Sequence, residues 1–409
     1  MKMVFAIFCI LCLLASALSA QEIEYVGSIN LPDGAMGIFV SGDYAYVANG
    51  YSGLLIIASG NPSNPYLAGS FDTPGESHDV FISGSYAYLI DYSSLLIINI
   101  GNPANPSLMG SIDALGNYYG VFVSGSYAYL ADVDSGLQIV DISDPANPSL
   151  AGSYDTQGYA WDVFVYGSYA YELDNYPYLR IINISDPTNP SLAGSFNMSG
   201  SAFDIFVSGI YAYIADLDLG LQIINISNPS NPSLAGSYDT PANANGVFIS
   251  GSYACIADGT SGLQIIDISD PANPSCVGSY DTPGGAVSVF VSSSYIYVAD
   301  WNSLMILSFA PIGIDDDPDP IPASPSLSPP YPNPFNARTT IEFTLPQAAR
   351  VRIDIFDLAG RAVGVAADGE FAAGTNRIIW DAGELTSGVY FYRIRAGDFS
   401  KTNKMLLIE

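Results

Sequence analysis

The stretch VFVSGSYAYLADVDSG, residues 121–136, recurs in near copies through the first three quarters of the chain. Within each copy, short segments of alternating apolar and polar residues are separated by Gly, Pro, Asp and Asn. This pattern is typical of β-strands joined by tight turns rather than of helices. Aligned on the phenylalanine, the copies are 41 or 42 residues apart, at Phe39, Phe81, Phe122, Phe164, Phe206, Phe248 and Phe290.

Each copy divides into four expected strands. In the third copy they are Gly120–Val123, Tyr127–Asp132, Leu137–Ile142 and Ser149–Tyr154. Four antiparallel strands in about 40 to 50 residues are the sequence signature of one blade of a β-propeller. The seven copies therefore predict an all-β fold with a seven-bladed propeller.

The two ends of the repeat array distinguish a ring from an open solenoid. The last copy stops after its third strand, SLMILSFAP, whereas the segment EIEYVGSINLPDG at residues 22–34 matches the missing fourth strand. An open solenoid requires polar caps at both ends, and closure instead removes the exposed strand edges. We therefore predict a ring in which the N-terminal strand completes the last blade.

Composition divides the chain into four parts. Residues 1–20 have the lysine, apolar run and small-residue ending of a secretory signal peptide. Residues 21–310 contain 27 acidic residues and a single base, Arg180, whereas residues 327–409 contain nine acids and nine bases. The stretch 311–326 is rich in Pro, Asp and Ser and is expected to be an extended linker. The propeller thus occupies residues 21–310, and a second domain occupies residues 327–409.

The charge limits the class of partner. The formal net charge is −29, which disfavours nucleic acid and anionic membranes because both would be repelled. After residue 20 no run reaches the roughly 18 apolar residues of a membrane helix, so we expect no transmembrane segment after signal cleavage. The protein is expected to be secreted or displayed on the outer cell surface.

The repeat resembles a known family. GLQIVDISDPANPSLAGSYDT, residues 136–156, together with VFVSGSYAYLAD is similar to the LVIVD repeat of exported bacterial β-propellers. The resemblance covers about residues 22–310. It implies the propeller architecture, and it implies adhesion or ligand binding as the role that members of the family are suspected to have.

The C-terminal segment reads as short alternating strands, for which we expect a small Ig-like sandwich. It resembles the type A C-terminal sorting domain of the type IX secretion system, which implies that the secretion translocon is a partner. The matching positions are Pro332, Asn333, Pro334, Phe335, Asn336, the turn from Asp357 to Gly360, Gly388 and Lys404.

The residue types that support chemistry are scarce. His78 is the single histidine, and its simplest interpretation is a loop residue. No phosphate loop, zinc spacing or calcium loop stands out, so no catalytic residue is assigned. Cys255 and Cys276 fall on the second and fourth strands of one blade, about 9.6 Å apart and beyond the ~7 Å limit for a disulfide. We therefore predict two free, buried thiols.

An aspartate ends the second strand of nearly every copy. A turn role explains such repetition, because Asp accepts backbone N–H bonds in a tight hairpin. We interpret the series as caps of the turn between the second and third strands rather than as ligands. Its members are Asp91, Asp132, Asp174, Asp216, Asp258 and Asp300, with Asn49 in the first copy.

The copies diverge most at the two residues before each phenylalanine, where the innermost strand of a blade begins. These residues should surround the mouth of the central channel, on the same face as the Asp series. The pairs are Met36-Gly37, His78-Asp79, Tyr119-Gly120, Trp161-Asp162, Phe203-Asp204, Asn245-Gly246 and Val287-Ser288. The candidate ligand-binding residues are Asp79, His78, Tyr119, Trp161, Asp162, Phe203 and Asp204.

An acidic mouth with aromatic walls suits a cation such as calcium, held through oxygen ligands, or a sugar or peptide. The alternative is that the three carboxylates only accept hydrogen bonds from backbone amides. No other cofactor is expected.

Two function classes follow, with a third left open. The first is a non-catalytic binding or adhesion protein that recognises a glycan or a protein. The second is a secreted hydrolase or lyase acting on polysaccharide, which needs two carboxylates about 5 to 9.5 Å apart beside an open cleft. A structural role as a spacer in a surface layer is the third.

Overall fold

A computed structural model describes residues 22–310, except 114–115, 157 and 175–177, together with residues 326–327, 335, 338–345, 349–371, 374–383, 385–397 and 399–407. The predicted signal peptide lies outside the described residues. So does the predicted linker, apart from Ser326, which begins a short strand.

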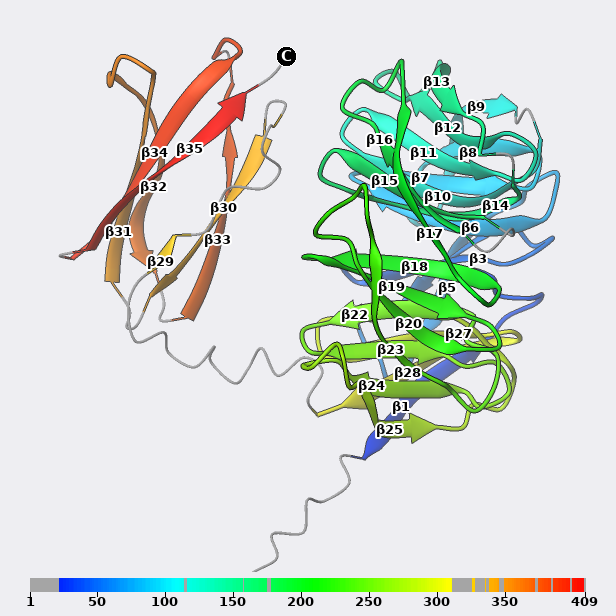
Figure 1. Ribbon diagram of the computed structural model, residues 1–409. Coiled ribbons are helices and arrows are strands. Elements are labelled where there is room, and N and C mark those ends of the chain that lie inside the picture. The colour runs from blue at the N-terminus through cyan, green and yellow to red at the C-terminus, as the bar shows by residue number, and fades with distance from the viewer. Residues whose placement is uncertain are drawn as a thin grey trace, which may run out of the picture.

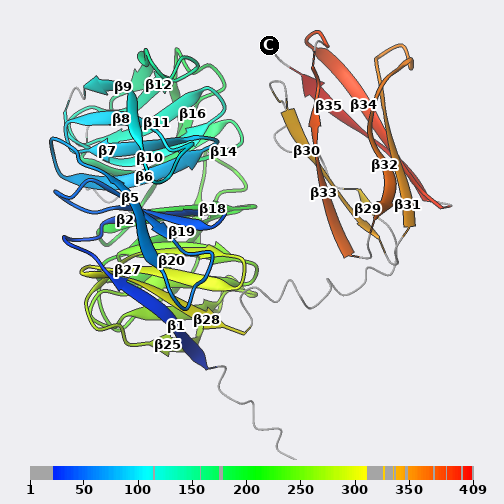
Figure 2. The same ribbon diagram turned by 180° about the vertical axis from the view of Figure 1, so that it is seen from behind.

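In the described residues, six of the sequence copies each form one antiparallel sheet of four strands, and the seventh forms such a sheet together with the N-terminal strand (Figure 1 and Figure 2). The blades comprise β2 (Gly37–Ser41), β3 (Tyr44–Ala48), β4 (Leu54–Ala58) and β5 (Tyr66–Phe71); β6 (Ser77–Ser83), β7 (Tyr86–Asp91), β8 (Ser94–Asn99) and β9 (Ser107–Asp113); β10 (Tyr118–Ser124), β11 (Tyr127–Asp132), β12 (Gly136–Asp141) and β13 (Ser149–Tyr154); β14 (Ala160–Tyr166), β15 (Tyr169–Asp174), β16 (Tyr178–Asn183) and β17 (Ser191–Asn197); β18 (Ala202–Ser208), β19 (Tyr211–Asp216), β20 (Gly220–Asn225) and β21 (Ser233–Tyr238); β22 (Gly246–Ser250), β23 (Tyr253–Ala257), β24 (Leu263–Asp267) and β25 (Ser275–Tyr280); and β26 (Ala286–Ser292), β27 (Tyr295–Asp300) and β28 (Ser303–Phe309) with β1 (Ile23–Asn30).

The N-terminal strand closes the ring. β1 pairs antiparallel with β28, with Ile23 opposite Phe309 and Asn30 opposite Ser303. Figure 1 shows this pair as the blue first strand beside the yellow last strand of the propeller. The predicted closure is confirmed, and the last blade gains the fourth strand that its own repeat lacks.

The apolar core lies between neighbouring blades. The middle strands of a blade are buried on both faces, so their residues alternate between the two adjacent blades. One cluster, for example, joins Tyr46 and Leu54 of the first blade to Val80 and Leu89 of the second. Similar clusters follow around the ring, and each blade is therefore stabilised mainly by its neighbours.

In six of the seven blades, a glycine on the fourth strand packs closely against the backbone of the next blade. In six copies, a methyl group added to this glycine would lie 2.0–2.4 Å from the carbonyl oxygen of a proline in the neighbouring Asp/Asn-Pro-x-Asn-Pro turn. The glycines are Gly27, Gly69, Gly110, Gly152, Gly194 and Gly236. Gly278 differs because the last copy lacks that turn, and its neighbours are the side chains of Ile23 and Phe309.

The two cysteines have different environments. Both are free, and Cys255 is fully buried in the middle of its blade, as predicted. Cys276 is exposed, so the prediction of a buried thiol there is wrong. It occupies the position of Leu150 and Leu234, which are also about half exposed. The fourth strand is the outer edge of the blade, and this position points to solvent.

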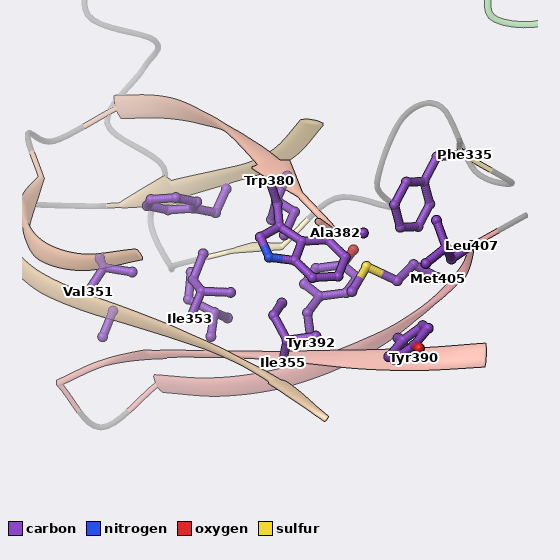
Figure 3. Packing of buried hydrophobic residues seen from close by; sticks show 14 of the residues in the cluster. Phe335, Val351, Ile353, Ile355, Trp380, Ala382, Tyr390, Tyr392, Met405 and Leu407 are labelled. Carbon is purple, nitrogen blue, oxygen red and sulfur yellow. The ribbon is translucent and has the colours of Figure 1, made fainter. Parts of the chain in front are cut away.

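The C-terminal residues contain two antiparallel sheets. One has the strand order β29 (Ser326–Leu327), β30 (Arg338–Leu345), β33 (Gly374–Asp381), and the other β32 (Ala362–Phe371), β31 (Ala349–Phe356), β34 (Gly388–Ala396), β35 (Phe399–Leu407). The sequence predicts strands at residues 340–345, 351–357, 375–380, 388–395 and 401–408, which correspond to β30, β31, β33, β34 and β35, whereas β29 and β32 were not anticipated. A shared core includes Trp380 from the first sheet and Ile353, Tyr392 and Met405 from the second (Figure 3).

Candidate functional site

The seven variable pairs lie at the start of the innermost strands. In the second blade, Ser77 pairs with Asp91 and Asp79 pairs with Ile90, so His78 is the extra residue of a β-bulge. The same bulge contains Tyr119, Trp161 and Phe203 in the next three blades. Bulges re-aim side chains at the ends of strands, and the bulged residue of each of these four blades lines the channel mouth. His78 therefore lies on a strand, and its interpretation as a loop residue is wrong.

These residues surround one cavity of about 470 Å³ at the channel mouth. All seven predicted candidates contribute to its lining, as does Glu76, which the sequence reasoning missed. Gly246 is the one member of the seven pairs that does not line it. The lining consists of Met36, Gly37, Glu76, His78, Asp79, Tyr119, Gly120, Trp161, Asp162, Phe203, Asp204, Asn245, Val287 and Ser288.

One side of the cavity is a continuous wall of rings. The centroids of His78 and Tyr119 are 4.6 Å apart, those of Tyr119 and Trp161 are 4.4 Å apart, and those of Trp161 and Phe203 are 5.4 Å apart. These spacings are those of favourable tilted and edge-to-face ring pairs. The opposite side has small or unbranched residues, including Gly37 and Ser288.

The three carboxyl groups join neighbouring blades. Asp79 accepts hydrogen bonds from the backbone N–H of Val80, at 2.8 Å, and of Val121 in the next blade, at 2.9 Å. Asp162 does the same with Val163, at 2.8 Å, and with Ile205 of the next blade, at 3.0 Å.

Asp204 accepts a hydrogen bond from Val247 of the following blade at 2.7 Å. The backbone-amide role that the sequence left open is thus present at all three positions. The same three carboxyl groups also line the cavity.

Asp162 and Asp204 also share a side-chain hydrogen bond. Two carboxyl groups bond in this way only when one of them keeps a proton. Burial and the neighbouring Asp204 raise the pKa of Asp162 well above its usual range. The pair of carboxyl groups therefore keeps one proton between them. Burial also raises the pKa of Asp204, and the hydrogen bond from Asp162 opposes that rise.

The other titratable groups of the cavity respond to the same burial. It raises the pKa of Asp79 to about 6, although the hydrogen bonds from Val121 and Val80 favour its charged form. Burial lowers the pKa of His78, and Glu76 partly opposes that change. Near neutral pH the cavity consequently contains a neutral imidazole beside carboxylates.

Seven phenylalanines form a closed collar in the channel. Each follows a mouth residue by two positions on its strand, so it lies on the same face one layer deeper. Neighbouring ring centroids are 4.7–5.0 Å apart around the full circle, including the contact between Phe290 and Phe39. The polar mouth therefore lies above an apolar collar.

The Asp series at the ends of the second strands has a wider structural role than predicted. Asp132 does cap its own turn, accepting from the N–H of Asp134 and of Ser135, but it also accepts from Gly116 in the loop before its blade. Asp216, Asp258 and Asp300 accept from the corresponding loops, through Ser201, Ala242 and Gly284 respectively. In these three blades the carboxylate thus bonds to the backbone of the loop that precedes the blade.

The motif residues of the C-terminal sheets have structural environments where they are described. Phe335 is buried against Trp380, with ring centroids 5.7 Å apart, and its N–H bonds to the carbonyl oxygen of Leu406. Gly360 has a φ of 76° in a turn that Asp357 caps, and Gly388 begins β34. Lys404 lies on β35. Pro332, Asn333, Pro334 and Asn336 lie outside the described residues.

Solved structures that resemble the chain share its fold. The β-propeller domain of Cps50 (Swd1) from Myceliophteria thermophila has a TM-score of 0.58 and 13% identity, covering 70% of this chain and 99% of that one. The computationally designed Ika8 protein has a TM-score of 0.54 and 7% identity, with the same coverage. A search of curated proteins finds no match. Among the described residues, no helix has the length and apolar character to cross a membrane.

Family models identify both parts of the chain. The secretion system C-terminal sorting domain matches residues 330–409, which indicates a secreted or cell-surface protein that contacts the type IX secretion machinery. The LVIVD repeat matches residues 33–73, 74–114, 116–156, 157–198, 199–240, 241–282 and 283–307, seven copies that correspond to the seven blades. The chain therefore belongs to the LVIVD-repeat family, as a seven-bladed propeller followed by a secretion sorting domain.

Proposed function

We propose that the protein is an exported, non-catalytic binding protein that holds its ligand at the mouth of the propeller channel. The cavity of about 470 Å³ carries this proposal. Its volume lies within the range of about 300 to 1,000 Å³ that small-molecule sites occupy. A cavity of this size accommodates a small molecule or the terminal group of a glycan or protein.

The composition of the cavity supports a binding role. Turn and core positions repeat from blade to blade, because they serve the same structural purpose in each. The mouth positions do not repeat, and the differences gather the rings and carboxyl groups on consecutive blades two to five. A seven-fold structural role does not require this asymmetry.

The polysaccharide-cleaving alternative fits the carboxyl groups less well. Glycosidases place their two carboxyl groups about 5 to 5.5 Å or 6.5 to 9.5 Å apart, with the sugar or a water between them. Asp162 and Asp204 instead bond to each other directly, which leaves no room for either. Asp79 uses both carboxyl oxygens to accept backbone N–H bonds.

Adhesion at the cell surface is the biological role that we propose for this binding. The sorting domain would deliver the propeller through the secretion translocon, after removal of the predicted signal peptide at residues 1–20. We retain residues 21–310 and 327–409 as the proposed bounds of the two domains.

A glycan and peptide array probed with the full chain tests the proposal. The double variant Trp161→Leu, Phe203→Leu removes two rings of the cavity, and Trp301→Leu removes an exposed ring that does not line it. We expect ligands that bind the wild type and the Trp301 variant but not the double variant. A blank array, or ligands retained by all three proteins, would contradict a binding role for the mouth.

A further inference from the structure

We infer that the ligand group bound at the mouth is a quaternary ammonium, such as a trimethylammonium head group. The inference rests on the proposed binding function and specifies the chemistry of that site. It follows from three features of the cavity: the sign of its charge, its aromatic wall and the hydrogen bonds that its carboxyl oxygens already accept.

The lining residues give the cavity a single sign of charge. Glu76, Asp79, Asp162 and Asp204 contribute carboxyl groups, and no Lys or Arg is among the lining residues. The propeller sequence contains one base, Arg180, and its guanidinium bonds to Asp174 at 2.9 Å. With a formal charge of −29 on the whole chain, the field attracts cations and repels anionic ligands.

The aromatic wall provides the contacts that an organic cation needs. A cation within about 6 Å of a ring centroid is attracted by the electron density of the ring face, most strongly for Trp, and aromatic cages recognise quaternary ammonium in this way. Tyr119, Trp161 and Phe203 lie side by side on three consecutive blades, and each lines the cavity. Tyr92 extends the wall, with its ring centroid 6.1 Å from that of Tyr119.

The hydrogen bonds of the carboxyl groups favour a cation without N–H donors. Both oxygens of Asp79 and both of Asp162 already accept backbone N–H bonds, and Asp204 bonds to Val247 and to Asp162. Each of these bonds uses one acceptor site of its oxygen, so a primary ammonium finds fewer acceptors here than at carboxylates without such bonds. A quaternary ammonium needs no acceptor and interacts with the carboxylates through charge alone.

The same arrangement suits calcium poorly. Calcium takes about six to eight oxygen ligands at short range, whereas the described residues contain no group of three or more His, Cys, Asp or Glu side chains placed to hold a metal. The phenylalanine collar below the mouth adds apolar surface, which methyl groups contact without the desolvation cost of an inorganic ion. Calcium therefore serves as the comparison cation in the test.

Isothermal titration of the full chain with choline tests the inference. The neutral comparison is 3,3-dimethylbutan-1-ol, which has the shape of choline with carbon in place of the charged nitrogen. Ethanolamine and calcium chloride, at matched ionic strength, represent a primary ammonium and an inorganic cation. We expect choline to bind at least about tenfold more tightly than each of the other three, consistent with the strength of a desolvated cation–π contact.

Two tryptophans of the chain provide a matched pair of variants. Trp161→Leu removes a ring of the wall, whereas Trp301→Leu removes a ring that is 46% exposed and does not line the cavity. We expect the first variant to weaken choline binding at least about tenfold and the second to leave it unchanged. Equal thermal melting of the two variants shows that the loss is not unfolding.

The outcomes separate this inference from the proposed function. Equal affinities for choline and its neutral analogue, or tighter binding of ethanolamine or calcium, would overturn the quaternary ammonium while leaving the mouth as a binding site. Choline binding that survives Trp161→Leu would place the cation elsewhere and overturn the inference. No choline binding, together with array ligands that depend on Trp161 and Phe203, would also overturn it and would support the proposed function alone.

Discussion

The α-carbon of Gly194 in β17 faces the carbonyl oxygen of Pro229 in the next blade, and a methyl group on Gly194 would lie 2.2 Å from that oxygen. The contact repeats around the ring wherever the Asp/Asn-Pro-x-Asn-Pro turn is present. It explains why the fourth strand keeps a glycine that its β-strand propensity would otherwise disfavour. The outer strand of one blade and the turn of the next pack backbone against backbone.

Replacing this glycine should destabilise the propeller. The proline carbonyl belongs to the backbone and moves little, so Gly194→Ala should lower the free energy of unfolding by about 1 to 3 kcal/mol, as over-packing does. Gly278→Ala is the matched control, because its nearest atoms are side-chain carbons of Ile23 and Phe309 at 3.3 and 3.4 Å. Denaturant unfolding of both variants measures the difference. Equal losses at the two positions would show that the Pro229 contact is not the cause.

Glu172 should be a destabilising residue at neutral pH. It is fully buried in β15, where the other blades have Leu, Ile or Val, and neither carboxyl oxygen has a hydrogen-bond partner among the described residues. Burial raises the pKa of Glu172 well above the usual range, and the negative charge of nearby Asp174 adds to the rise. Arg180 opposes it. We expect Glu172→Leu to stabilise the protein by about 1 to 3 kcal/mol at pH 7.

The pH dependence of this effect has a definite sign. Because the folded-state pKa of Glu172 exceeds the unfolded value of about 4.3, its ionisation penalises folding increasingly as the pH rises from that value toward the raised pKa. The advantage of Glu172→Leu should therefore be largest at pH 7 and smallest near pH 4. Thermal melting across this range provides the measurement. An advantage that is constant with pH, or a loss of stability at pH 7, would contradict the account.

Asp132 should stabilise the junction between two blades, and not only its own turn. Its carboxylate accepts three backbone N–H bonds while fully buried, so Asp132→Ala leaves buried donors unsatisfied and should cost about 1 to 3 kcal/mol or more. Asp144→Ala is the comparison, since this aspartate also accepts a backbone N–H but is exposed. Equal unfolding midpoints for the two variants would refute the assigned role.

Choline binding should weaken as the pH falls from 7 to 5. Asp79 has a pKa of about 6, so acidification converts its carboxylate to a neutral acid and removes a negative charge from the mouth. Protonation of His78, whose pKa is lowered, acts in the same direction at still lower pH. The other titratable groups of the cavity are Glu76, Tyr119, Asp162 and Asp204. Titrations at several pH values should show a several-fold loss centred near pH 6, and an affinity that rises toward pH 5 would contradict the assignment of Asp79.

The sequence was sufficient for most of the architecture. Alternating apolar positions separated by turn residues are local signals, and Tyr127–Asp132 and Ser149–Tyr154 have the predicted bounds. The ring closure followed from the unmatched strand at each end of the array. The positions around the channel mouth followed from comparing the copies, because structural positions repeat and the mouth positions do not.

Other features depend on contacts between blades, which no local pattern reports. The bond between Asp162 and Asp204 joins residues 42 positions apart, and its shared proton depends on burial in the channel. Glu76 reaches the mouth from a loop, and His78 faces it because of a bulge. The exposure of Cys276 depends on which face of an edge strand is covered. In the C-terminal sheets, Ala362–Phe371 has few strongly apolar residues, so strand β32 escaped prediction.

A crystal of the full chain soaked with (2-bromoethyl)trimethylammonium would test the central claim most directly, because the anomalous signal of bromine locates the cation. The account predicts one dominant bromine peak inside the mouth, with the trimethylammonium group against Tyr119, Trp161 and Phe203 and near Asp204. A dominant peak elsewhere on the acidic surface, or a mouth that stays without density at saturating concentration, would contradict it.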